Sequence, residues 1–254
     1  MKWKSHITIA KAISASMGFT KDLEKAFSQG SIDPDKRPDW VVSVLEVARE
    51  PHHKPSLGVV MKHIWKARLS YLDGDNIRAL KSLGKALHYV QDKCVSKGFL
   101  SLSHNSREAD LLRQMVSEDS IKMGFNMAVC SPHYIKDTIR RVKPSGDLSE
   151  IMRQACLYSA AIAKAVLGNK NPSSKLLEDF GTANKNYRKR TIPVSIGVIM
   201  VILLASLVAF FSWRLELGHL AILVASVISA GYITQRLDLK YHYLKEEAKW
   251  FRIR

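Results

Sequence analysis

The sequence is short of residues and patterns that define several common protein classes. Its three cysteines, Cys94, Cys130 and Cys156, are widely spaced and form neither a zinc knuckle nor an even set of disulfides, which suits a reducing compartment. The sequence contains no glycine-rich phosphate loop, no internal repeat and no alternation of apolar and polar residues that predicts a β-sheet. Nucleotide-binding α/β folds, repeat arrays and disulfide-stapled scaffolds are therefore not expected.

Acidic residues are also scarce relative to basic ones. The chain has 39 Lys and Arg residues against 23 Asp and Glu residues, which gives a formal net charge of +16. This balance favours phosphate-bearing partners, either lipid head groups or nucleic acid, while ordinary solubility is the simpler explanation. A length of 254 residues is enough for one sizeable core and an accessory segment.

Helical patterns recur along residues 1–170, and they predict an all-α helical bundle there. The chain opens with MKWKSHITIAKAISASMGF, whose interrupted apolar residues indicate an amphipathic helix rather than a signal peptide. Asp39 is predicted to cap a helix that begins near Trp40, and Asp75 a longer helix with an apolar stripe. Ser131 and Pro132 are predicted to begin another helix, and a packing helix is expected from 151 to 167.

Two histidine–carboxylate pairs stand out between residues 83 and 108. His88 precedes Asp92 by four positions, and His104 precedes Glu108 by the same spacing. On an α-helix this spacing places both groups on one face, so an imidazole and a carboxylate can bind a single cation. One such pair is more often an internal hydrogen bond, but two in succession favour a metal site. Gly84, one turn before His88, would leave room for another backbone or a ligand.

These residues carry a family resemblance. The segments ALHYVQD and HNSRE resemble the paired signature of the zinc-dependent phospholipases C and the related single-strand-specific nucleases, in which His-x-x-x-Asp is followed by His-x-x-x-Glu or His-x-x-x-Asp. The resemblance covers about the first two-thirds of the chain. It implies an all-helical domain with a cluster of up to three zinc ions that binds a phosphodiester.

The resemblance also implies ligands near the N-terminus. In the family, an early histidine and the amino-terminal tryptophan of the processed chain bind the third zinc. Trp3 and His6 resemble that pair, but Met1 and Lys2 precede Trp3, so its amine is not free unless the chain is trimmed. Trp3 as a core or interfacial anchor is the alternative.

An acidic loop and a histidine pair resemble the family segments that complete the first zinc site. Asp33 and Asp35 compete for the aspartate that binds this zinc and acts near the attacking water; we favour Asp35, which follows a proline, and assign it the catalytic role. The family has one histidine ligand in the stretch that here contains His52 and His53, and the sequence leaves both open. His63 is interpreted as structural or surface-facing.

The second zinc site departs from the family pattern. The aspartate equivalent to Asp92 bridges two zinc ions, and His104 and Glu108 are expected to bind the second ion. A further histidine is expected six residues after Asp92, but that position is Gly98. Water, a phosphate oxygen or another side chain such as His133 would have to complete this site.

Composition changes sharply after residue 170. Residues 171–191 are predicted to form a basic polar linker, followed by an uncharged apolar run at 192–213 and a second at 220–233. At about 1.5 Å per residue the first run is long enough to cross a hydrocarbon layer about 30 Å thick. We predict a transmembrane helical hairpin at 192–234, with a buried soluble hairpin as the alternative.

Basic residues flank this hairpin on both sides. Arg188, Lys189 and Arg190 precede it, and an amphipathic basic tail at 235–254 follows it. Cationic flanks remain on the cytoplasmic side, so the prediction is a multi-pass membrane protein with the helical domain and both termini in the cytoplasm. The aromatic and basic tail is expected to lie at an anionic lipid surface.

The combined prediction is a membrane-anchored, zinc-dependent phosphodiester hydrolase. A tethered site meets lipid constantly, which favours a phospholipase C acting on phospholipid head groups. A nuclease-like phosphodiesterase is the first alternative; the charge favours nucleic acid, but stacking aromatics are not evident around the motifs. The second alternative is a non-catalytic membrane protein that keeps a degenerate metal site, because of Gly98 and the residues that precede Trp3.

Overall fold

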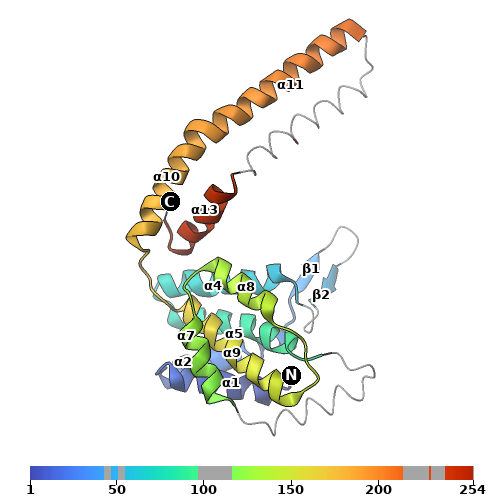
Figure 1. Cartoon of the computed structure of the whole chain (residues 1–254). Helices are drawn as coiled ribbons and strands as arrows, with labels where there is room; N and C mark the ends of the chain where they lie inside the picture. The colour runs from blue at the N-terminus through green and yellow to red at the C-terminus, as the bar shows by residue number, and fades with distance from the viewer. Residues whose placement is uncertain (43–46, 51–54, 97–115, 214–228, 230–237, 254) are drawn as a thin grey trace. The chain divides into compact units, whose positions relative to one another are not determined.

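The computed structural model describes residues 1–42, 47–50, 55–96, 116–213, 229 and 238–253 (Figure 1). The chain divides into two compact units, Met1–Lys170 and Asn171–Arg254. Helices dominate both units, which confirms the predicted all-α class. Within the described residues, strands are confined to one antiparallel pair, β1 (Trp40–Val42) and β2 (Val47–Arg49).

The first unit is organised around α5 (Asn76–Lys93), which packs against α2, α4 and α9. Its apolar stripe, Leu80, Leu83, Leu87 and Val90, is almost completely buried, as the helical spacing predicts. The other helices of this unit are α1 (Trp3–Ser16), α2 (Lys21–Gly30), α3 (Asp33–Lys36), α4 (Leu57–Leu72), α7 (Glu118–Met127), α8 (Pro132–Arg141) and α9 (Leu148–Val166).

Two helix starts agree with the predicted caps, and a third prediction is wrong. The carboxylate of Asp75 accepts the backbone N–H of Arg78, and the hydroxyl of Ser131 caps α8. Asp39 does not begin a helix, because the next residues form β1. Its carboxylate is occupied by side chains from α4 and α5, and the valines that follow it favour an extended backbone.

Glycines allow α2 and α5 to approach closely. A Cβ atom on Gly84 would lie 2.5 Å from the carbonyl oxygen of Phe27, and one on Gly30 would lie 2.2 Å from the carbonyl oxygen of Lys81. Any side chain would therefore force the helices apart. The space that was predicted beside Gly84 is filled by the backbone of α2, which carries Ser31 to the face of α5.

Arg68 caps the C-terminal end of α9 with hydrogen bonds. Its side chain is fully buried on α4, and its guanidinium donates to the carbonyl oxygens of Val166 at 2.9 Å, Gly168 at 3.2 Å and Asn169 at 2.6 Å. Carbonyls at a helix end lack partners within the helix, and a buried cation needs acceptors. One side chain satisfies both requirements.

The second unit contains α10 (Ser174–Asn186), a π-helical turn (Tyr187–Thr191), α11 (Ile192–Trp213) and α13 (Leu239–Trp250). Residues 171–191, predicted as a linker, thus contain a regular helix. Helices α10 and α13 share a small core of Phe180, Ala183, Tyr241, Leu244 and Ala248. The rings of Tyr187 and Tyr241 stack against each other with centroids 3.8 Å apart.

The predicted hairpin is only partly described. Its second apolar run, apart from Ser229, lies outside the described residues. Among the residues that are described, no helix has both the length and the apolar character needed to cross a membrane.

Candidate metal centre

Three of the predicted ligands converge in the first unit. His6 on α1, Asp35 on α3 and His88 on α5 offer donor atoms that all lie within 4.8 Å of one another. Asp92, one turn after His88, borders the same group: its Oδ2 lies 3.4 Å from His88 Nε2 and its Oδ1 lies 3.2 Å from His6 Nε2. In the described part of the chain, no other set of three such side chains is this close.

The separations suit a shared ion. Two ligands held at 2.0–2.1 Å from a tetrahedral zinc lie about 3.3–3.5 Å apart, from the geometry of the site. His88 Nε2 is 3.6 Å from Asp35 Oδ1 and 3.4 Å from Asp92 Oδ2, distances too long for good hydrogen bonds between imidazole and carboxylate. The donor atoms are therefore spaced as ligands of one ion would be.

Hydrogen bonds on the far side of each ring fix which nitrogen faces the cluster. His88 Nδ1 lies 2.9 Å from the carbonyl oxygen of Ser31, which only accepts, so Nδ1 carries a hydrogen. His6 Nδ1 lies 2.6 Å from Gln91 Oε1, and the amide of Gln91 donates to Ser159 Oγ at 3.0 Å. Metal-binding histidines commonly have such partners, which leave Nε2 with its lone pair directed at the ion.

Burial makes a cation the natural partner of these lone pairs. His6 and His88 are both fully buried, and His6 Nε2 has no hydrogen-bond partner. A buried nitrogen without a partner is costly, and its lone pair next to carboxylate oxygens is repelled. A divalent ion between them would satisfy both, so this nitrogen and oxygen donor set fits a metal such as zinc. The Asp35 side chain is 25% exposed and opens the site to solvent.

An amino group also reaches the cluster, but it belongs to Met1 rather than Trp3. The Met1 amine contacts Asp92 Oδ1, and both groups are buried. The side chain of Trp3 is instead exposed on α1, with Lys36 Nζ 4.9 Å from the centroid of a ring. The amine that lies at the cluster is thus that of Met1, in an ion pair with Asp92.

The other predicted ligands separate into those outside the cluster and those outside the described residues. Asp33 forms an ion pair with Lys85 at 2.6 Å, so Asp35 is the aspartate of the loop that reaches the cluster. His133 lies on α8 and does not belong to the cluster. Five positions that the sequence analysis singled out for the zinc sites lie outside the described residues: His52, His53, Gly98, His104 and Glu108.

A second histidine–carboxylate pair lies beside the cluster and was not predicted as a site. His63 Nε2 lies 2.7 Å from Asp39 Oδ2, which also accepts the hydroxyl of Tyr89 at 2.9 Å. Burial lowers the pKa of His63 despite this bond. Burial alone would raise the pKa of Asp39, but the bonds from His63 and Tyr89 and the charge of Lys62 outweigh it and hold that pKa below its usual value.

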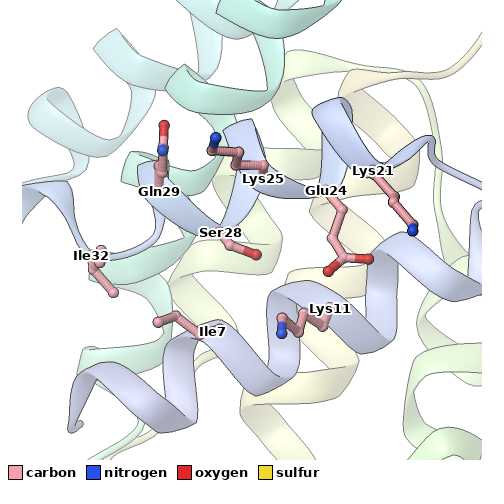
Figure 2. Close-up of a pocket in the computed structure, with 8 residues that line it drawn as sticks. All are labelled: Ile7, Lys11, Lys21, Glu24, Lys25, Ser28, Gln29 and Ile32. Carbon is pink, nitrogen blue, oxygen red and sulfur yellow. The ribbon is translucent and has the colours of Figure 1, made fainter.

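A shallow groove between α1 and α2 lies near the cluster and has a volume of about 300 Å³ (Figure 2). Ile7 and Ile32 form its apolar end, and three lysines and one glutamate contribute its charge. None of the cluster residues lines it. The lining residues are Ile7, Lys11, Lys21, Glu24, Lys25, Ser28, Gln29 and Ile32.

No protein-family model, no curated protein and no solved structure matches this chain. Only the chain's own residues therefore indicate what it does. Its fold and its buried donor atoms define a helical protein with a candidate metal centre.

Proposed function

We propose that the protein is a zinc-dependent phosphodiester hydrolase that acts as a phospholipase C on phospholipid head groups. The observation that carries this proposal is the convergence of His6, Asp35, His88 and Asp92 from three different helices. The motif resemblance supplies the reaction class. The net charge of +16 favours a phosphate-bearing substrate.

Each residue of the cluster has a role that its surroundings support. His6 and His88 would hold the ion through Nε2, and Gln91 and Ser31 hold their rings in place. Asp35 has the exposed carboxylate, so it is placed to orient a water molecule and accept its proton. When bound, zinc would lower the pKa of water toward about 7 and neutralise phosphate charge.

Asp92 presents its two oxygens to different histidines. Oδ1 lies 3.2 Å from His6 Nε2 and also contacts the Met1 amine, whereas Oδ2 lies 3.4 Å from His88 Nε2, so Asp92 would serve as a ligand through Oδ2. The proposal allows up to three zinc ions. The remaining ligands would come from His52 or His53 and from His104 with Glu108.

We also propose that residues 192–234 attach the protein to a membrane as a hairpin, with the helical domain and both termini in the cytoplasm. Helix α11 has no charged residue, and the apolar side chains of Val194, Val201, Leu204 and Val208 are each more than half exposed. Contiguous exposed apolar surface of this kind needs a partner, and lipid is one that matches the basic flank at 188–190. A membrane location favours a lipid substrate.

Product analysis of the purified full-length protein tests the function. The protein should be untagged at its N-terminus, because the amine of Met1 contacts Asp92. With added zinc, it is given phospholipid vesicles, single-stranded DNA or RNA, and a chromogenic phosphodiester. Release of diacylglycerol or its ether-lipid counterpart supports the proposal, and release of nucleotides supports the nuclease alternative. Metal-dependent melting without turnover supports a non-catalytic metal site.

The substitution Asp92→Asn removes the negative charge of the carboxylate that lies next to both His6 and His88. The variant should lose both zinc retention and phosphodiester hydrolysis, because an amide is a poor metal ligand in place of a carboxylate. Elemental analysis after gel filtration measures the zinc. Asp137→Asn is the matched control, since that carboxylate is exposed on α8 and pairs with Arg140 at 3.1 Å. Unchanged zinc stoichiometry in Asp92→Asn would count against the proposal.

A further inference from the structure

Asp35 lies on a segment that cannot hold itself in place. Helix α3 has only four residues, Asp33–Lys36, and isolated helical turns have little intrinsic stability. Asp35 Oδ1 nevertheless lies 3.6 Å from His88 Nε2. Contacts made by this turn and by the residues next to it must therefore keep this carboxylate near the cluster.

The first contact lies before Asp35 in the sequence. Asp33 Oδ2 forms an ion pair at 2.6 Å with Nζ of Lys85, which lies one turn before His88 on α5. Both side chains are partly exposed, at 15% and 28%. Ion pairs at such positions contribute little, because water screens them and long side chains lose freedom. This contact alone is a weak attachment.

The second contact follows Asp35 and is stronger. Asp39 Oδ2 accepts the hydroxyl of Tyr89, the residue after His88 on α5, at 2.9 Å. The same oxygen lies 2.7 Å from His63 Nε2 on α4, whose side chain is 8% exposed. The lowered pKa of Asp39 means that it is ionised at neutral pH, so both bonds are charge-assisted.

The backbone of Asp39 adds a third connection. Its carbonyl oxygen accepts the N–H of Glu50 at 2.8 Å, and the buried Glu50 carboxylate in turn accepts the N–H of Ser56. Asp39 is therefore a junction between the segment that bears Asp35, helices α4 and α5, and the chain that leads into α4. Neither His63 nor Tyr89 belongs to the cluster of His6, Asp35 and His88.

We propose that Asp39, held by His63 and Tyr89, is a positioning residue that keeps Asp35 against His88 and thereby sets the metal affinity of the site. The inference rests on the proposed metal-dependent function. A ligand that is already in place loses little freedom when the ion binds, whereas a loose one must be ordered at that moment. Loss of the Asp39 contacts therefore weakens binding although no ligand is removed.

Cobalt binding to the full-length protein tests this proposal. Tyr89→Phe removes the hydroxyl but keeps the ring that packs edge-on against His88, with centroids 5.5 Å apart. Its affinity for Co²⁺, measured by competition with a chelator, should fall by up to about 10-fold. This is the lower end of the effect of removing a direct hydrogen-bond partner of a ligand, because Tyr89 acts one contact further out, through Asp39. The visible absorption of bound Co²⁺ should also change, because it reports the coordination by Asp35.

Two further variants separate positioning from general stability. Tyr71→Phe makes the same chemical change on α4 near residues Arg68 and Lys170, and it should leave affinity and spectrum unchanged. His63→Gln keeps an N–H donor for Asp39, so it should bind Co²⁺ more tightly than His63→Leu. Thermal unfolding of every variant in EDTA records effects on the metal-free fold.

Each outcome has a distinct meaning. If the wild-type protein binds neither Co²⁺ nor zinc, the proposed function and this inference both fail. If it binds metal but hydrolyses no phosphodiester, the proposed function fails, and the affinity of Tyr89→Phe still decides the inference. If Tyr89→Phe loses thermal stability in EDTA yet binds Co²⁺ like the wild type, Asp39 has a purely structural role and the inference is overturned.

Discussion

Among the described residues, two histidine–carboxylate pairs differ in one distance: His63 on α4 with Asp39 before β1, and His88 with Asp92 on α5. In the pair of His63 and Asp39, Nε2 lies 2.7 Å from the carboxylate, whereas in the pair of His88 and Asp92 the separation is 3.4 Å. The short pair is a satisfied hydrogen bond. The long pair leaves a gap that an ion could fill, so distance rather than residue type distinguishes a structural pair from a candidate ligand pair.

The surroundings of the two pairs explain this difference. Asp39 shares its oxygen with the hydroxyl of Tyr89, whose pKa is raised by burial, so this partner stays neutral and adds no second negative charge. His88 instead faces two carboxylates, Asp35 and Asp92, and its ring lies 4.4 Å from that of His6. Two carboxylates therefore lie beside two imidazoles. The Met1 amine contacts Asp92, and a metal ion at His88 and Asp35 would supply further positive charge.

The largest expected effect is the difference in zinc affinity between two variants that carry the same substitution, one in each pair. His88→Gln should reduce zinc affinity by at least about 100-fold, because it removes a direct nitrogen ligand. His63→Gln should keep the wild-type stoichiometry, since His63 acts only through Asp39. Isothermal titration of both variants measures the contrast. Equal losses in the two variants would remove the distinction between the pairs.

A smaller effect is expected at the contact that orients His88. In Gly84→Ala, the new Cβ would meet the carbonyl oxygen of Phe27 and the backbone nitrogen of Ser31, 2.7 Å away. Unfolding in urea with EDTA should show a loss of about 1–3 kcal/mol from overpacking. Zinc affinity should also fall, because the Ser31 carbonyl that accepts from His88 is displaced.

Gly58→Ala is the control for this variant. A Cβ at Gly58 on α4 would meet no atom within 4 Å. Replacement of a helical glycine by alanine should leave stability unchanged or raise it by about 0.5–1 kcal/mol. A similar loss in both variants would mean that the close approach of α2 and α5 is not responsible.

The smallest expected effect is on the pH dependence of the free energy of unfolding, and it concerns the pair of His63 and Asp39. Because burial lowers the pKa of His63 below 6.5, the unfolded chain binds this proton more readily than the folded protein. The associated stability is complete above pH 6.5 and decreases as the pH falls below that value. His63→Gln should therefore show a flatter dependence of unfolding free energy on pH, measured in EDTA. A slope equal to that of the wild type would contradict this. In the wild type the bonds from His63 and Tyr89 hold the pKa of Asp39 below its usual value, so Asp39 titrates at a lower pH than His63.

Local rules account for the parts of the fold that the sequence predicted. The caps at Asp75 and Ser131 bind backbone N–H groups within three residues, so their patterns are visible in short windows. Asp39 resembled these caps, but its partners, His63 and Tyr89, lie 24 and 50 residues away. No short window contains that competition, so the predicted helix near Trp40 was wrong.

The residues of the candidate site likewise separate into those that the sequence indicated and those that it did not. His88 and Asp92 share a helix face, so their spacing alone indicated proximity, and the motif resemblance pointed to His6 and Asp35. The amine of Met1 lies 91 residues from its partner and was missed. Ser31 contributes a backbone carbonyl, which has no signature in a sequence. Gln91 could have been found, because it is a polar residue within the motif and adjacent to Asp92.

The guanidinium of Arg68, on α4, satisfies the carbonyl oxygens at the end of α9 from within the first unit. Its three bonds reach no further than Asn169, and the donor comes from α4 rather than from downstream residues. If a stop codon were introduced after Lys170, or another membrane anchor were fused there, the carbonyl oxygens at the end of α9 would still be bonded to Arg68. The unit Met1–Lys170, which holds the candidate metal centre, therefore supplies the cap of its own last helix.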